Sequence, residues 1–147
     1  MSDYSEFPVR SPFIESLGMR LVRAEDGVSE IELTLEPQHM NTWGVAHGGL
    51  TMTLLDVALS LAARSAADQS GVVTVEMNTS FMQPGRGALR AHGRVMHQSS
   101  TMAFCEGEVR DANGAFVAKA LGTFKYLRKL AVGRTIVEQQ HPGSGSD

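Results

Sequence analysis

Cysteine is almost absent from this sequence, in which Cys105 is the only one among 147 residues. A single cysteine excludes an internal disulfide, and this is typical of cytoplasmic proteins. Long hydrophobic runs are also missing, since no apolar stretch reaches the ~18 uncharged residues that a membrane span requires. The N-terminus is acidic and lacks the apolar segment of a signal peptide. We therefore expect a cytoplasmic protein that does not associate with a membrane.

The motifs of several common chemistries are missing as well. The five histidines lack the i, i+4 or cysteine-linked spacing of a metal site, so we expect no metal. Gly85-x-Gly87 is followed neither by the third glycine of a dinucleotide loop nor by the Lys-Ser/Thr of a P-loop. No Gly-x-Ser-x-Gly elbow of a serine hydrolase occurs in the part expected to fold. We expect no cofactor.

Net charge is only −3, but the charge is unevenly distributed. Residues 1–85 carry 4 basic and 11 acidic side chains, whereas residues 86–147 carry 9 basic and 5 acidic ones. A nucleic-acid-binding protein would need a larger basic surplus, with exposed aromatic residues among it. The basic half is either a solvated edge and tail or a surface that meets a polyanionic ligand such as a nucleotide phosphate. Four basic residues are candidates for contacts with such phosphates: Arg86, Arg90, Lys125 and Arg128.

Hydrophobic periodicity predicts one long helix. The apolar run after His47-Gly48-Gly49 keeps its leucines near helical spacing and does not alternate with a period of two. It predicts about 18 helical residues, or roughly 27 Å, within residues 41–66. A shorter helical piece is expected between Ser11 and Gly18, where Ser-Pro begins and Gly ends a short pattern.

Alternation of apolar and polar residues predicts five strands. They lie at 28–35, 72–82, 88–97, 101–110 and 115–126. In the second of them the alternation places one set of residues on a single face: Val73, Val75, Met77, Thr79 and Phe81.

The order of these elements predicts a single α+β domain. Short connections between the last four strands imply antiparallel pairing. One sheet and one mostly apolar helix bury each other only if the sheet curls around the helix. We expect a polar leader at 1–11, a folded domain at 12–130, and a tail at 131–147 that is disordered at its Gly/Ser-rich end.

The long predicted helix also carries a narrow polar seam made of Thr53, Asp56 and Ser60. Aspartate is unfavourable inside a helix and is rarely buried unless it is paired or used in chemistry. Asp56 is therefore a candidate catalytic residue. Its alternative role is that of a structural acid, bonded to the backbone of a neighbouring subunit.

The pattern Asn41-x-x-Gly44-x-x-His47-Gly48-Gly49, followed seven residues later by Asp56, resembles the acyl-CoA thioesterases of the hotdog fold. Within that group it is most similar to the phenylacetic-acid-degradation type. The resemblance extends over residues 12–127 and implies an antiparallel sheet of five to six strands wrapped around one central helix. It also implies homodimers with joined sheets, often paired into homotetramers. Their active sites lie at the dimer interface, where the helix start of one subunit faces the helix acid of the other.

The resemblance assigns a role to each residue of the pattern. The Gly48 N–H would hold the oxyanion at the positive end of the helix, and Gly49 would let the substrate approach the backbone closely. Asp56 would act on water as a general base or attack the thioester as a nucleophile. The remaining candidates have supporting roles. Asn41 would orient the loop or the water, His47 would brace the turn, Thr74 would place a hydroxyl near the water, and Trp43 would line the acyl pocket or anchor the loop.

The expected reaction is therefore hydrolysis of an aryl- or medium-chain acyl-CoA to the free acid and coenzyme A. Two other functions remain open. A non-catalytic acyl-CoA-binding module would keep the fold and lose the acid. A hotdog hydratase or dehydratase would also use a histidine and an acid on acyl thioesters, but would place them differently from this pattern.

Overall fold

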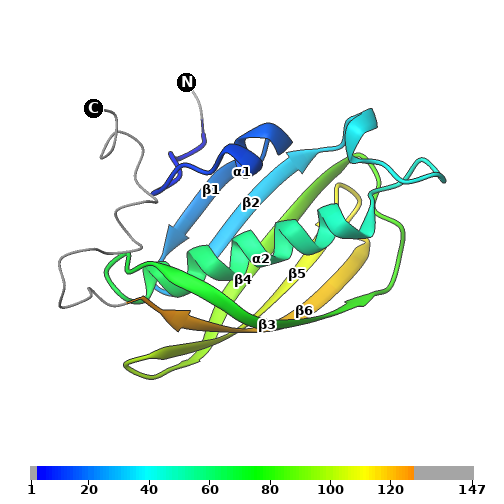
Figure 1. Ribbon diagram of the computed structural model, residues 1–147. Helices are drawn as coiled ribbons and strands as arrows, with labels where there is room; N and C mark the ends of the chain where they lie inside the picture. Colours follow the sequence, from blue (N-terminus) through cyan, green and yellow to red (C-terminus); the bar gives the residue numbers. More distant parts are fainter. Residues whose placement is uncertain (1–2, 128–147) are drawn as a thin grey trace.

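The computed structural model of the chain describes residues 3–127. The tail expected at 131–147 and the phosphate candidate Arg128 lie outside the described residues. The elements in chain order (Figure 1) are α1 (Pro12–Leu17), β1 (Arg20–Glu25), β2 (Val28–Thr34), the 3-10 helix η1 (Pro37–His39), α2 (Gly48–Ser65), β3 (Val72–Phe81), β4 (Ala88–Gln98), β5 (Met102–Asp111) and β6 (Phe116–Tyr126). Neither of the α-helices among them combines the length and the apolar character needed to cross a membrane.

The six strands form one antiparallel sheet in the order β1-β2-β4-β5-β6-β3. The sheet curls around α2, which lies across its concave side (Figure 1). This is the α+β hotdog arrangement, so the predicted fold class is confirmed. The strand that the sequence did not locate is β1, at the edge of the sheet. Its alternation is interrupted by a bulge between Leu21 and Arg23, and Leu21 is its only buried residue, so its apolar signal is too short to detect.

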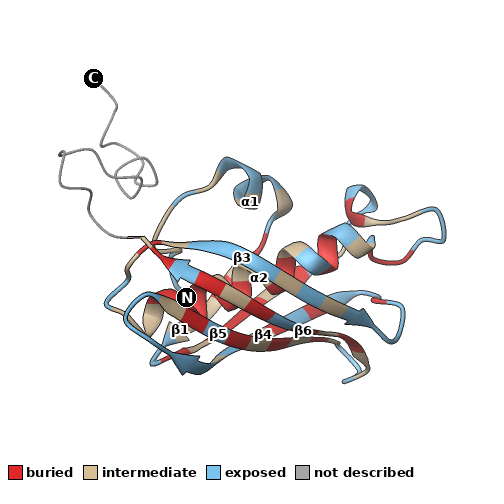
Figure 2. Cartoon of the chain, turned by 60° about the horizontal axis from the view of Figure 1, so that its bottom comes forward, coloured by how far each residue is buried: buried red, intermediate tan, exposed pale blue. Residues whose placement is uncertain are grey.

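The core lies between α2 and the concave face of the sheet, and Figure 2 shows the buried residues gathered there. Leu54, Leu55 and Leu59 of α2 are fully buried, and so are Ile31 and Leu33 of β2. Ten of the 18 residues of α2 are buried and eight of these are leucine or alanine, so the seam of polar residues differs in character from the buried side of the helix.

Glycines in β4 and β5 let α2 approach the sheet closely. A Cβ added at Gly93 would lie 2.5 Å from the carbonyl oxygen of Ala58, and one at Gly107 would lie 2.8 Å from Leu59 Cδ2. Ser29 Oγ donates a hydrogen bond to the same Ala58 carbonyl at 2.5 Å. Larger side chains at these points would push the helix away, so the sheet sets the position of α2 and of every residue that α2 carries.

A bulge in β3 shifts by one residue the alternation that decides which of its side chains face α2. Thr74 pairs with the buried Phe124, and Glu76 pairs with the next residue along β6, which leaves Val75 unpaired. Directly opposed residues of an antiparallel pair share a face, so Thr74 lies on the α2 side, and so does Met77 after the bulge. The prediction that Val73 and Val75 share a face with Met77 is therefore wrong. The extra residue shifts the alternation by one, and these two valines are 40% and 55% exposed.

Candidate active site

Asp56 projects from the third turn of α2 and is held by β3. Thr74 Oγ1 donates a hydrogen bond to Asp56 Oδ1 at 2.6 Å. Within residues 3–127 no other side chain hydrogen-bonds or ion-pairs with this carboxylate, so Oδ2 remains open to a water or a substrate. The other seam hydroxyls bond within the helix, because Thr53 and Ser60 each donate to the carbonyl four residues earlier at 2.7 Å. Asp56 is thus the seam residue whose side chain is directed away from its own helix.

The N-terminus of α2 presents a free N–H group. His47 is the N-cap, and its Nδ1 accepts a hydrogen bond from the Gly49 N–H at 2.9 Å. Its carbonyl accepts from the N–H groups of Leu50 and Thr51 at 2.9 and 3.1 Å. Among the four N–H groups of this first turn, that of Gly48 has no acceptor in the described part of the chain. A free N–H at the positive end of a helix is suited to bind an anionic oxygen.

A cavity of about 370 Å³ lies beside Gly48 and is also lined by Asn41, Phe81 and residues 82–85. A Cβ placed on Gly48 would contact the Phe81 ring only at 3.6 Å, an ordinary van der Waals distance. The space next to the free N–H is therefore open within one chain.

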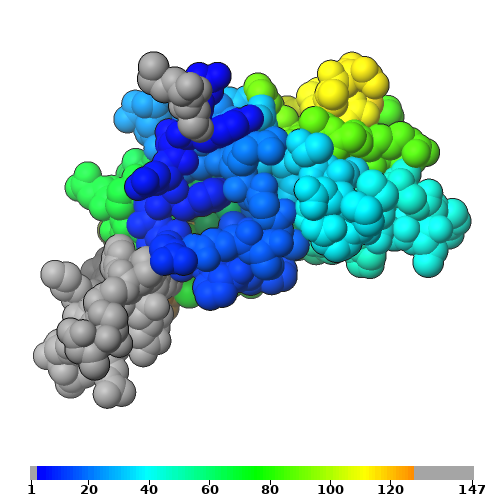
Figure 3. Space-filling view, turned by 90° about the horizontal axis from the view of Figure 1, so that it is seen from above, coloured from blue at the N-terminus to red at the C-terminus, as the bar shows by residue number. Residues whose placement is uncertain are grey.

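Asn41 organises the loop that precedes this cavity. Its Oδ1 accepts hydrogen bonds from the N–H groups of Trp43 and Val45 at 2.9 and 3.3 Å. The side-chain oxygen therefore shapes the turn, while its amide nitrogen finds no acceptor within residues 3–127 and can donate to a ligand. Trp43 lies at the tip of this loop with 83% of its surface exposed. Figure 3 shows the loop, in cyan, projecting at one end of the molecule.

His39 is a residue of the site region that the sequence interpretation missed. It is buried, its Nδ1 accepts from the Glu36 N–H at 3.0 Å, and its carbonyl accepts from the His47 N–H at 2.9 Å. It thereby fixes the residue that caps α2. The sequence signal was weak, because a lone histidine after Glu-Pro resembles an ordinary loop residue.

The described geometry separates the candidate residues into two groups. Asn41, His47, Gly48 and Gly49 surround the start of α2, whereas Asp56 and Thr74 meet further along the helix. Asp56 follows Gly48 by eight residues, which is about 12 Å of helix. Reacting groups must come within roughly 3–3.5 Å of one another, so one thioester carbonyl cannot reach both groups in a single chain.

The phosphate candidates are not gathered in one place. Arg86 directly follows Gly85, which lines the cavity beside Gly48. Lys125 of β6 is paired with Met102, the first residue of β5, and Asp111 is the last residue of that strand. Arg90 pairs with the carboxylates of Glu30 and Glu32, so its charge is already balanced. Of the described candidates, Arg86 is the chain neighbour of a residue that lines this cavity, whereas Arg90 and Lys125 do not line it.

Cys105 takes no part in this arrangement. It is buried in β5, and burial raises the pKa of its thiol to about 12. A neutral, enclosed thiol is not a nucleophile at physiological pH.

Comparison with known proteins places the chain in a family. The family model described as Thioesterase superfamily matches residues 44–118. The chain belongs to the thioesterase superfamily. The matched segment contains the turn at His47, both glycines, Asp56 and Thr74, and begins three residues after Asn41.

Individual relatives of this thioesterase agree with the assignment. Human acyl-coenzyme A thioesterase 13 is 32% identical over 108 residues, which cover 70% of this chain and 76% of that protein. A conserved protein of Pseudomonas aeruginosa is 33% identical, with a TM-score of 0.77 over 81% of this chain and 96% of that one. A mutant of the phenylacetic acid degradation protein PaaI of Thermus thermophilus is 27% identical, with a TM-score of 0.73 over 80% and 100%. As a member of this superfamily, the enzyme is a thioester hydrolase.

Proposed function

We propose that this thioesterase hydrolyses acyl-CoA, with Asp56 of one subunit and the Gly48 N–H of a second subunit acting on the same carbonyl. One observation carries the proposal. An open carboxylate oxygen and an unpartnered helix-start N–H lie on the same helix, about 12 Å apart along its axis. Two copies related by symmetry would bring the carboxylate of each to the helix start of the other.

The assembly would form through β3. This strand is an edge of the sheet and is ten residues long, with Val73 and Val75 exposed on it. Proteins usually cover an exposed apolar edge strand or pair it with another strand. We infer a homodimer in which the β3 edges of two copies meet and the two sheets become continuous, with a further pairing of dimers into a homotetramer.

In the proposed reaction Asp56 takes a proton from water while the water oxygen bonds to the thioester carbon. The carbonyl oxygen becomes an oxyanion and accepts a hydrogen bond from the Gly48 N–H of the other subunit. The C–S bond then breaks, and the departing coenzyme A thiolate takes the proton from Asp56. Thr74 fixes the carboxylate by donating to Oδ1, which leaves Oδ2 for the water. His47 holds the turn through the Gly49 N–H.

The alternative covalent route uses the same residues. Asp56 would attack the thioester carbon, expel the thiolate and form an anhydride that water then hydrolyses. Incorporation of heavy oxygen from labelled water into the Asp56 carboxylate during a single turnover would identify the anhydride route.

Acyl-CoA is the proposed substrate because the human relative is named an acyl-coenzyme A thioesterase and because Arg86 directly follows Gly85, which lines the Gly48 cavity. Arg86 is the candidate for the coenzyme A phosphates that the geometry favours. Lys125 would contribute only from another subunit or from another part of the surface, and Arg90 would first have to release the carboxylates of Glu30 and Glu32. Arg128 stays a candidate outside the described residues. An aryl or medium-chain acyl group remains the proposed class. Trp43, exposed at the loop tip, would cover it or contact the second subunit.

The test is the Asp56→Asn variant, measured with a panel of aryl- and alkyl-CoA thioesters and by thermal melting. Asparagine keeps the shape and removes the base, so kcat should fall at least ~10²-fold while the melting temperature and the dimer are retained. Full turnover by a folded, dimeric variant would remove the catalytic assignment and favour an acyl-CoA-binding module. Loss of activity that follows loss of the dimer would indicate a structural acid.

A further inference from the structure

Arg64 is a buried cation that has no partner among the described residues. It lies in the last turn of α2, only 5% of its surface is exposed, and its Nε is buried with no hydrogen-bond acceptor. Within residues 3–127 it forms no ion pair. Burial lowers the pKa of Arg64, but a guanidinium stays protonated at physiological pH. Charges are rarely buried unless a partner compensates the lost hydration, so the position of Arg64 indicates a missing anion.

The Arg64 side chain lines a cavity of about 420 Å³ between α2 and the N-terminal segment. The other lining residues are Val57, Ser60 and Leu61 of α2, Val72 of β3, and Phe7, Val9, Arg10, Ser11, Pro12 and Ile14. The walls that the described residues form are mostly apolar and include no aspartate or glutamate. Figure 3 shows the N-terminal residues, in dark blue, lying over this side of the molecule.

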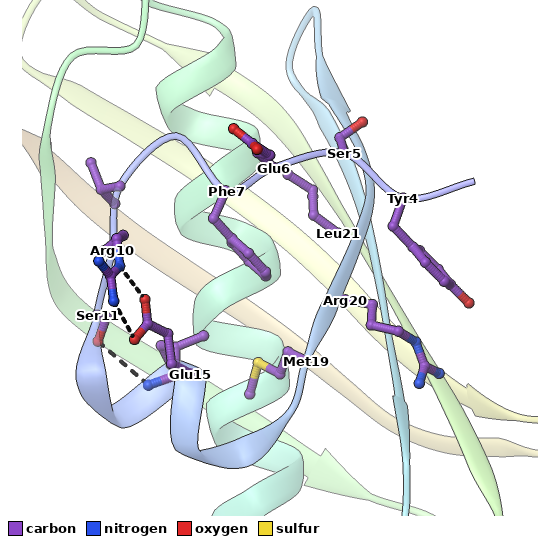
Figure 4. Close-up of a pocket in the computed structure, with 12 residues that line it drawn as sticks. Tyr4, Ser5, Glu6, Phe7, Arg10, Ser11, Glu15, Met19, Arg20 and Leu21 are labelled. Carbon is purple, nitrogen blue, oxygen red and sulfur yellow. Dashed lines mark hydrogen bonds and ion pairs between the residues drawn. The ribbon is translucent and has the colours of Figure 1, made fainter. Parts of the chain in front are cut away.

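The second arginine of the cavity is already paired. Arg10 Nε lies 2.6 Å from Glu15 Oε1, and its Nη2 lies 3.2 Å from Glu15 Oε2. Figure 4 shows this pair in the neighbouring cavity of about 680 Å³, which shares five lining residues with the first one: Phe7, Val9, Arg10, Ser11 and Ile14. Arg64 is therefore the cation that remains available to a ligand.

The cavity extends the proposed catalytic seam. Asp56, Ser60 and Arg64 lie at i, i+4 and i+8, so they follow one another along one side of α2. Val57 follows Asp56 in the chain, and Val72 precedes Thr74 on the α2 side of β3. From Asp56 to Arg64 the helix rises about 12 Å. Asp56 does not itself line the cavity, which extends along α2 from Val57, the next residue in the chain, to the guanidinium two turns from Asp56.

We propose that this cavity holds the acyl group of the substrate, and that Arg64 binds a carboxylate at the far end of that group. The preferred substrate is then the coenzyme A thioester of a dicarboxylic acid, with an apolar chain between the thioester and the free carboxylate. This inference rests on the proposed function, because it places the thioester at Asp56. Phe7, Leu61 and Val72 contact the chain, and the planar guanidinium donates two parallel hydrogen bonds to the carboxylate.

The experiment compares suberyl-CoA with octanoyl-CoA, which have the same chain length and differ in a terminal carboxylate or methyl group. The unmodified enzyme should show a kcat/KM at least about tenfold higher for suberyl-CoA. Arg64→Met should remove that preference through a loss on suberyl-CoA, and Arg64→Lys should retain part of it because it keeps the charge without the planar fork. Arg94→Met is the matched control. Arg94 pairs with Glu106 at 2.8 Å and lines neither this cavity nor the one beside Gly48, so its replacement should leave the preference unchanged.

A second measurement does not depend on hydrolysis. Free suberate should raise the melting temperature of the unmodified protein more than 1,8-octanediol does, because the diol has the same chain length and no carboxylate, and Arg64→Met should abolish the difference. If octanoyl-CoA is hydrolysed as well as suberyl-CoA, or Arg64→Met lowers both equally, the inference is overturned while hydrolysis stands. If neither thioester is hydrolysed but suberate still stabilises the protein through Arg64, the proposed function fails and the carboxylate site stands.

Discussion

Thr74 Oγ1 donates a hydrogen bond to Asp56 Oδ1 at 2.6 Å and so joins the edge strand β3 to the central helix. The contact depends on the bulge at Val75, because the alternation that brings Met77 to the α2 side would otherwise turn Thr74 away from it. The bulge in β3 thus directs the Thr74 hydroxyl to the Asp56 carboxylate, while Met77 and the residues after it keep their alternation. Bulges that redirect a side chain near an active site are common in sheets.

Replacing Thr74 by valine should lower kcat/KM roughly 10- to 100-fold, which corresponds to the loss of one hydrogen bond to a charged group. Thr74→Ser should recover most of the activity because it keeps the hydroxyl. The measurement is steady-state kinetics on the acyl-CoA that the panel identifies as the best substrate.

Thr79→Val is the matched control on the same strand. Thr79 is also directed towards α2, but its buried Oγ1 has no hydrogen-bond partner. Removing an unsatisfied hydroxyl should leave activity unchanged and keep or raise the melting temperature. Equal activity in the Thr74→Val and Thr79→Val variants would show that the contact with Asp56 has no catalytic role.

The two glycines at the start of α2 should respond differently to alanine. Gly48→Ala adds a methyl group beside the free N–H, where the nearest contact is the Phe81 ring at 3.6 Å. The fold should tolerate it, but the methyl group should keep the substrate carbonyl away from the N–H, with a fall in kcat of up to ~10²–10³-fold. Gly49→Ala would place a Cβ 3.1 Å from His47 Nδ1 and disturb the cap, at a cost of about 1 kcal/mol in the free energy of unfolding. Kinetics and thermal melting of both variants separate these effects, and a fully active Gly48→Ala enzyme would exclude the proposed oxyanion site.

Subunit complementation tests whether the site is shared between chains. Homodimers of Asp56→Asn and of Gly48→Ala should both be inactive. A mixed dimer has one site with an intact Gly48 from one chain and an intact Asp56 from the other. Unfolding the two variants together and refolding them should therefore restore about a quarter of the normal activity, because half of the dimers are mixed and each has one working site. No recovery from a mixture that forms dimers would show that each chain carries a complete site.

Cys105 should resist thiol reagents in the folded protein. Burial raises its pKa from an ordinary 9.0 to about 12, so the native thiol stays protonated at pH values at which the unfolded chain has a thiolate. This contribution to stability is fully present below pH 9 and is lost as the pH rises towards 12. The checks are labelling rates with and without denaturant, and melting temperatures in the same pH range for the unmodified protein and for Cys105→Ala. Rapid labelling of the native protein at pH 8 would contradict the assignment.

The sequence by itself determined the central helix, the residues of its first turn, and the acid on its polar seam. These features depend on local spacing, since helical hydrogen bonds join residues four apart and the N-cap, the glycines and Asp56 all lie within 41–66. The alternation of the later strands was also readable, because each strand has one buried face.

The tertiary structure decided the features that join distant parts of the chain. β1 was missed because its pairing with β2, rather than its own short pattern, makes it a strand. The contact of Thr74 with Asp56 required a bulge whose position depends on register with β6. The sequence does not single out Arg64, since a cation in the last turn of a helix is common and interacts favourably with the helix dipole. Only the packing of residues 7–14 over α2 encloses it without a carboxylate, because burial depends on what lies nearby in space, whatever its distance along the chain.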